Sequence, residues 1–190
     1  MMPGTPVLLC LDLQQEFVTP GRPWSDPDGE DIALTCARII EAARKAGWSL
    51  VHSHLHQGAP MIAGHGLTQP IPGCEPRPGE VLLRRAGVSA YAHPDLDGIL
   101  EGGDAASAFV IGFSAPMSMT ATLFDAADRV HALSLIEEAI GAADVGEWGA
   151  EHTRALCLDT ARKMHRAVRL ADVKGLDMPA VTAPGGRRIA

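Results

Sequence analysis

The sequence predicts an α/β protein built on a parallel sheet with helices on both faces. Two short stretches, residues 7–11 and 107–112, are continuous apolar runs of the kind that form central strands buried on both faces. Between them, apolar residues recur at helical spacing over residues 31–46, and Gly47 stands where such a helix ends. Strands that alternate with helices imply βαβ crossovers and hence a parallel, Rossmann-like sheet.

The remaining elements follow along the chain. Strands are expected at residues 7–11, 48–54, 81–83, 107–112, 130–136 and 167–170, and helices at 31–46, 94–100, 117–127 and 151–165. Six strands separated mostly by helices favour a three-layer α/β/α arrangement. We predict one domain over residues 1–178 and a loose tail over residues 179–190, where Pro and Gly cluster.

Composition excludes several classes of protein. A hydrophobic content of 46% with 21% charged residues is typical of a folded globular chain. The net charge is −7 and the basic residues are dispersed, which argues against nucleic acid as a partner. No run approaches the ~20 apolar residues of a membrane span, and the N-terminus lacks signal-peptide features, so we expect a cytoplasmic protein. The four cysteines form no CxxC pair, which fits reduced thiols.

Asp12 stands directly after the first expected strand. In open parallel sheets, ligands bind outside the carboxyl ends of the strands, so an acid in this place is a candidate for chemistry. Its structural alternative is a loop or helix-cap acid. Cys10 lies two residues earlier and is expected to be an inert core thiol.

Three blocks of the sequence resemble the isochorismatase-like hydrolase superfamily. The first, LLCLDLQQEF, carries Asp12, Gln14 and Phe17 in an Asp-x-Gln-x-x-Phe pattern. In the second, residues 76–100, the family has a lysine four residues before a Ser-Ala-Phe element, and this chain has Arg85.

The third block, residues 110–133, resembles the family's nucleophile block, Gly-x-x-Thr-x-x-Cys. Gly112 matches in register, and Ser118 stands at the cysteine position. The resemblance covers about residues 5–170, and three blocks in the right order are far more specific than one motif.

The resemblance implies a hydrolase of small amides. In the family an aspartate takes the proton of a cysteine thiol, a lysine completes the triad, and a thioester forms. The corresponding residues here are Asp12, Arg85 and Ser118. The resemblance also implies a homo-oligomer and an oxyanion hole of backbone N–H groups, with a cis peptide just before the nucleophile. The Ala115–Pro116 bond is the candidate for it, because a bond before proline becomes cis at lower cost.

The two replacements weaken the nucleophile. A serine hydroxyl is far less acidic than a thiol, and Arg85 stays protonated and cannot shuttle a proton. Acid catalysis, which the resemblance to the isochorismatase branch implies, needs a protonated Asp12, and a neighbouring arginine opposes this. Two hypotheses stay open: a hydrolase of a small-molecule amide or related substrate with an altered triad, or an inactive member that binds a small molecule or a protein partner through the same pocket.

Each assigned residue has an ordinary structural alternative. Arg85 could form a plain salt bridge, with Arg84 as a competing register, and Ser118 could cap a helix. The predicted substrate-binding residues are Phe17, Trp24, Tyr91 and Ala115. The aromatic members of this set form either a wall for a flat substrate or ordinary packing.

Alternating histidines follow the second expected strand. His54 and His56 overlie an Asp-x-His pair that the resemblance to metal-binding nicotinamidases implies, and His65 is the candidate third ligand. Three neutral imidazoles and a water suit a zinc-like ion. The alternative is a group of solvated or hydrogen-bonded histidines, and the triad hypothesis itself requires no cofactor.

Overall fold

The computed structural model describes residues 5–56, 59, 66–102 and 108–178. Within these residues six strands form one all-parallel sheet in the order β3-β2-β1-β4-β5-β6. The strands are β1 (Val7–Leu11), β2 (Ser49–Leu55), β3 (Val81–Arg85), β4 (Ala108–Gly112), β5 (Leu133–Ile140) and β6 (Ala167–Val168). The predicted fold class is confirmed.

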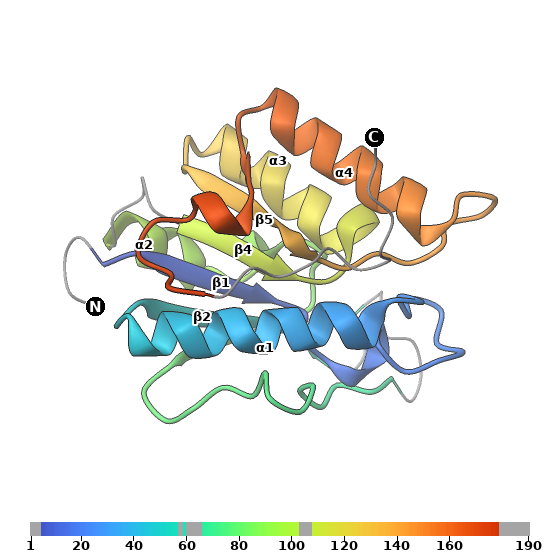
Figure 1. Cartoon of the computed structure of the whole chain (residues 1–190), viewed down its shortest axis with the longest axis horizontal. Coiled ribbons are helices and arrows are strands. Elements are labelled where there is room, and N and C mark those ends of the chain that lie inside the picture. The colour runs from blue at the N-terminus through green and yellow to red at the C-terminus, as the bar shows by residue number, and fades with distance from the viewer. Residues whose placement is uncertain (1–4, 57–58, 60–65, 103–107, 179–190) are drawn as a thin grey trace.

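Helices cover both faces of the sheet (Figure 1). Helix α1 (Gly29–Lys45) lies on one face, and α3 (Thr120–Asp128) and α4 (Ala150–Lys163) lie on the other. Side chains of α2 (Asp95–Gly102) pack in the same cluster as those of α3 and α4. The buried side chains accordingly form two clusters, one on the α1 face and one on the α3–α4 face.

Helix α1 illustrates how local sequence determines an element. Its buried residues recur at spacings of three and four, and they include Ile32, Cys36, Ile39, Ile40 and Ala43. Acidic side chains occupy its first turn and basic side chains its last, which favours the helix dipole. Gly47, with a φ of 73°, follows its end. No helix in the described ranges is long and apolar enough to cross a membrane.

Strand β5 differs from the expected residues 130–136. Val130 has a φ of 61° and is 85% exposed, so it belongs to the turn after α3. The strand instead continues through Glu137 and Glu138 to its end at Ile140. Both carboxylates have partners there, since Glu137 accepts from Arg162 at 2.6 Å and Glu138 accepts from a backbone N–H at 2.8 Å. These tertiary partners allow charged residues inside a strand.

Strands β1 and β4 approach each other closely at their carboxyl ends. Gly112 has a φ of 118°, and a Cβ at this position would overlap the carbonyl oxygen of Leu11. The N–H of Phe113 donates to that same oxygen at 2.9 Å. The segment that follows β4 therefore leaves the sheet beside Asp12.

Candidate active site

A fully buried ion pair joins Asp12, after β1, to Arg85, at the end of β3. The guanidinium donates from Nη1 to Oδ1 at 2.7 Å and from Nη2 to Oδ2 at 2.8 Å, and both side chains are 0% exposed. Asp12 has a φ of 51° and donates its N–H to the carbonyl of Ser53 at 2.9 Å. Such a bidentate pair is strong and directional. Arg84 is exposed, so the Arg85 register is the one that meets Asp12.

Hydrogen bonds connect this pair to the helix that carries Ser118. Arg85 also donates to two carbonyls of the loop after β3, including that of Ser89 at 3.1 Å. The next residue, Ala90, donates its N–H to Oγ1 of Thr122 at 2.9 Å. Thr122 is buried in α3, one turn beyond Ser118. The three blocks of the sequence resemblance thus belong to one connected network.

Ser118 is completely buried inside η4 (Ala115–Met119), a π-helical turn that leads into α3. It is not a helix cap, because Ser114 occupies the N-cap position. In the described part of the chain the cis peptide bond joins Phe113 and Ser114, so the expectation of a cis bond before Pro116 is wrong. The cause is that the chain turns as it leaves β4, before it reaches the proline.

The backbone N–H groups around Ser118 are largely committed within the protein. Ala115 donates to Gly141 at 2.7 Å, and Met117 and Met119 both donate to Ser114 at 3.1 and 3.0 Å. The predicted oxyanion hole therefore does not include these three N–H groups in this conformation. Ala115, predicted to bind substrate, is buried in the core cluster on the α3–α4 face.

Sequence reasoning missed two buried hydroxyls near the carboxyl ends of β2 and β4, the two strands that flank β1. Ser53 lies in β2 and Ser114 precedes η4, with exposures of 0% and 1%. Neither hydroxyl has a hydrogen-bond partner among the described residues. An unpaired buried hydroxyl costs about 1–3 kcal/mol, so both are candidates to bind a water or a ligand atom. The sequence feature that could have indicated them is a small polar residue close to the end of an apolar strand.

The isochorismatase domain model matches residues 6–165 of the chain. The chain belongs to the isochorismatase family. Maleamate amidohydrolase from Pseudomonas putida is 24% identical to it over 153 residues, which are 72% of each protein. A cysteine hydrolase from Pseudomonas syringae pv. phaseolicola has a TM-score of 0.74 at 18% identity, over 91% of this chain and 93% of that one. N-carbamoylsarcosine amidase from Thermoplasma acidophilum has a TM-score of 0.69 at 22% identity, over 88% of this chain and 97% of that one. These structures share the fold.

None of the four cysteines of this isochorismatase-family chain offers a ready thiolate. All four are buried and free of disulfides. Burial raises the pKa of the thiols of Cys10, Cys36 and Cys157, and raises that of Cys74 to about 12. At neutral pH they are protonated and therefore poor nucleophiles. Cys10 is the core thiol that the sequence predicted.

Two of the alternating histidines form part of a charge network on the α1 face. The rings of His52 and His54 lie edge to face, with centroids 6.1 Å apart. Nε2 of His52 lies 2.9 Å from Glu80, which accepts from Nε of Arg44 in α1 at 2.7 Å. Burial lowers the pKa of His52. Burial, with positive charge nearby, lowers the pKa of His54 to about 3.

The structure does not bring the predicted zinc ligands together within its described residues. His54 is buried, whereas His56 is exposed, and His65 lies outside the described residues. No group of three or more His, Cys, Asp or Glu side chains placed to hold a metal ion occurs in the described ranges. The zinc site stays a prediction.

The three predicted aromatic contacts do not form one wall. Phe17 stacks on Phe113, with centroids 6.0 Å apart, and both Phe17 and Trp24 pack on the α1 face. Tyr91 packs in the cluster on the opposite face, and its hydroxyl lies 2.9 Å from Nδ1 of His131. In this structure the three aromatic side chains therefore pack in two separate clusters, and their contact with a substrate stays a prediction.

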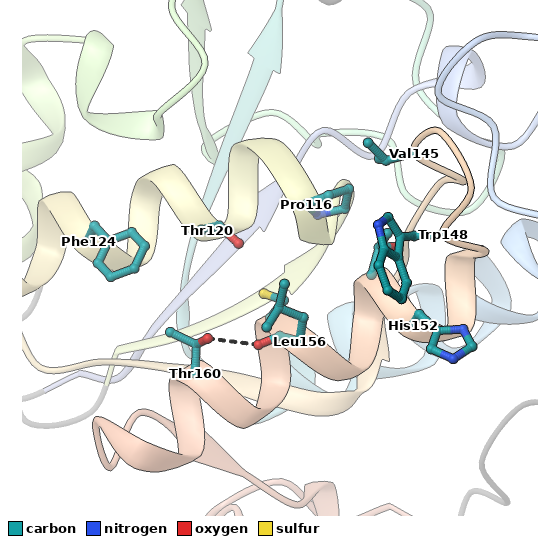
Figure 2. A pocket seen from close by; sticks show the side chains of 10 residues that line it. Pro116, Thr120, Phe124, Val145, Trp148, His152, Leu156 and Thr160 are labelled. Carbon is teal, nitrogen blue, oxygen red and sulfur yellow. Dashed lines mark hydrogen bonds between the residues drawn. The ribbon is translucent and has the colours of Figure 1, made fainter.

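Two surface cavities lie away from the ion pair. One, of about 620 Å³, lies between α3 and α4 (Figure 2), and another, of about 530 Å³, is formed mainly by residues 18–31. Neither is lined by Asp12, Arg85 or Ser118, whose exposed fractions are 2% or less. The candidate site is closed in this conformation.

Proposed function

We propose that this chain hydrolyses a C–N bond of a small-molecule amide, with Asp12, Arg85 and Ser118 as the reacting centre. The observation that carries the proposal is the buried bidentate pair, which hydrogen bonds connect to the helix of Ser118. The names of two relatives, maleamate amidohydrolase and N-carbamoylsarcosine amidase, support amides as the substrate class.

In the proposed reaction, the oxygen of Ser118 attacks the amide carbon while its proton passes to the carboxylate of Asp12. The proton then passes from Asp12 to the leaving nitrogen as the C–N bond breaks, and an ester on Ser118 remains. Water attacks the carbon of this ester and gives one proton to Asp12. The bond between that carbon and the oxygen of Ser118 then breaks, Asp12 returns the proton to Ser118, and the carboxylic acid leaves.

Arg85 remains a cation throughout this cycle. Because both oxygens of Asp12 already accept from Arg85, taking up the proton of Ser118 requires one of these hydrogen bonds to break, and we expect slow turnover. Substrate entry also requires the closed site to open.

The test is ammonia release from maleamate, N-carbamoyl amino acids and simple primary amides. We expect Ser118→Ala to reduce turnover by at least about 100-fold, as the loss of a nucleophile does. Ser134→Ala, on β5, is the matched control and retains activity. Near-UV circular dichroism verifies that each variant is folded. Unchanged turnover in folded Ser118→Ala would contradict the proposal.

A second function, binding without hydrolysis, is favoured by the closure of the site. Asp12 and Ser118 are 0% exposed, and a guanidinium occupies both carboxylate oxygens. The double variant Arg85→Lys/Ser118→Cys restores the residue types that the family resemblance implies. If wild type releases no ammonia and this variant does, the chain is an inactive member with a retained pocket. If wild type is the more active of the two, the binding function is wrong.

A further inference from the structure

We infer that the hydroxyls of Ser53 and Ser114 bind the polar groups of an uncharged primary amide beside Asp12. Both hydroxyls are buried, and neither has a hydrogen-bond partner among the described residues. The inference rests on the proposed function, because it takes the centre formed by Asp12, Arg85 and Ser118 as the place where the amide is held. It adds two residues to this site and narrows the substrate class to small amides without a net charge.

Ser53 lies on the face of the sheet that α3 covers. It pairs in register with Leu11 of β1 and Leu83 of β3, and both of these side chains belong to the cluster on the α3–α4 face. Residues that pair in register share a face, so the hydroxyl of Ser53 is on this face too. Arg85 follows Leu83 by two positions and therefore shares it. The carbonyl of Ser53 accepts the N–H of Asp12 at 2.9 Å, which places Ser53 directly beside the ion pair.

Ser114 stands on the other side of Asp12. Strand β4 pairs with β1 in register as far as Gly112, which is opposite Leu11, and Ser114 follows two positions later. Ser114 is the N-cap residue of η4, a position where a serine hydroxyl normally accepts a backbone N–H. Here the side chain makes no such bond, and two N–H groups of the turn bond to the carbonyl of Ser114 instead. The hydroxyl is therefore left available to a ligand.

A small amide matches these two hydroxyls in chemistry and in size. A buried hydroxyl without a partner destabilises the folded chain, and a ligand that supplies the missing hydrogen bond offsets this cost. The carbonyl of a primary amide accepts from a hydroxyl, and its N–H groups donate to one. Strands β2 and β4 are two strand spacings apart, about 10 Å, with β1 between them. A ligand that contacts both hydroxyls is therefore small and lies at the end of β1.

The charges around the site favour a ligand without a net charge. Both oxygens of Asp12 accept from Arg85, so the pair neutralises itself. Arg84 is exposed and lies on the opposite face of β3, and Arg22, in the loop after β1, is paired with the buried Glu16. Residues 56–66, which follow β2, contain neither lysine nor arginine. A carboxylate held at this site is thus a buried charge without a partner, which costs far more than a buried amide.

A matched pair of ligands tests the inference in the Ser118→Ala variant, in which the proposed nucleophile is absent. Butyramide is an uncharged primary amide, and succinamate carries a carboxylate in place of its methyl group. In an NMR titration, butyramide is expected to bind at least about tenfold more tightly. In the same background, Ser53→Ala and Ser114→Ala are each expected to weaken the binding of butyramide about fivefold. Ser134→Ala, on β5, is the control and leaves the binding unchanged.

The stability of the ligand-free protein separates ligand binding from a structural role. Ser53→Ala and Ser114→Ala each remove an unpaired buried hydroxyl, so each is expected to raise the Tm by about 2–4 °C while it weakens binding. A hydroxyl that serves only the fold gives a lower Tm and unchanged binding. That result in both variants, or equal binding of butyramide and succinamate, would overturn the inference.

Ammonia release from butyramide tests the proposed hydrolysis separately. If wild type binds butyramide through the two serines but releases no ammonia, the hydrolysis is wrong and the inferred contacts stand. If wild type releases ammonia but the KM for butyramide is unchanged in Ser53→Ala and in Ser114→Ala, the hydrolysis stands and the inference is wrong. Absence of both binding and ammonia release would overturn both.

Discussion

Two charge networks lie on different strand ends of this sheet and differ in their access to water. In the first, the side chains of Asp12 and Arg85 are both 0% exposed, and Arg85 donates to Asp12 and to two neighbouring carbonyls. In the second, Glu80 and Arg44 are 13% and 11% exposed, and Glu80 also contacts the buried His52. Water can replace a lost partner in the second network but not in the first. We therefore expect that removal of one charged partner lowers the free energy of unfolding more in the first network than in the second.

The largest effect is expected for Asp12→Asn. The variant leaves the guanidinium of Arg85 buried without its counter-charge, which costs about 3–5 kcal/mol of the free energy of unfolding. Asparagine tolerates the φ of 51° at this position, so the change measures charge and not backbone strain. Urea unfolding gives the value. The double variant Asp12→Asn/Arg85→Met should recover much of the loss, and a single-variant cost below about 1 kcal/mol would refute the closed pair.

Lowering the pH is expected to have an intermediate effect on the free energy of unfolding, through the histidines beside the second network. The folded pKa of His54, about 3, lies below the ~6.5 of an unfolded histidine, so the unfolded state takes up the proton first as the pH falls. Above about pH 6.5 His54 is neutral in both states and does not reduce the free energy of unfolding. As the pH falls from there toward the folded pKa, the free energy of unfolding decreases by at most about 1.4 kcal/mol per pH unit.

The measurement is urea unfolding from pH 7 to pH 4.5. His54→Gln should remove this part of the acid dependence, whereas the exposed His152→Gln should leave it unchanged. An identical pH slope in wild type and His54→Gln would mean that His54 is not held neutral.

The smallest effect is expected for Glu80→Gln. Burial by itself would raise the pKa of Glu80, but hydrogen bonds from Arg44, the N–H of Arg77 and His52 lower it to about 2. The variant loses these charge-assisted bonds, and because water reaches the site, we expect a cost of only about 1–2 kcal/mol. Arg162→Ala, which breaks an exposed pair, is the control at about 0.5 kcal/mol or less. A Glu80→Gln cost equal to that of Asp12→Asn would remove the distinction between the networks.

Much of the fold was predictable because its signals are local. Short apolar runs and helical spacing predicted six strands and the helices between them, and the register of the motif blocks selected Arg85 over Arg84 as the residue that meets Asp12. The bounds of β5 were not predictable, because Glu137 and Glu138 depend on partners from α4 and from the segment after β6. The division of the predicted aromatic side chains between two clusters was not predictable for a related reason, since the packing of Phe17 and Tyr91 depends on residues far away in the sequence.

By itself, the sequence determined the order of the elements, the family, and which residue types stand at the three positions that the resemblance implies to be catalytic. Only the tertiary structure decided that Arg85 occupies both oxygens of Asp12, that Ser118 is buried in a π-helical turn, and that Leu156 on α4 is left exposed. The physical reason is the distance along the sequence over which the interactions act. Helices and strands follow from neighbours a few residues apart, whereas burial and ion pairing depend on side chains such as Asp12 and Arg85, which are separated by 73 positions in the chain.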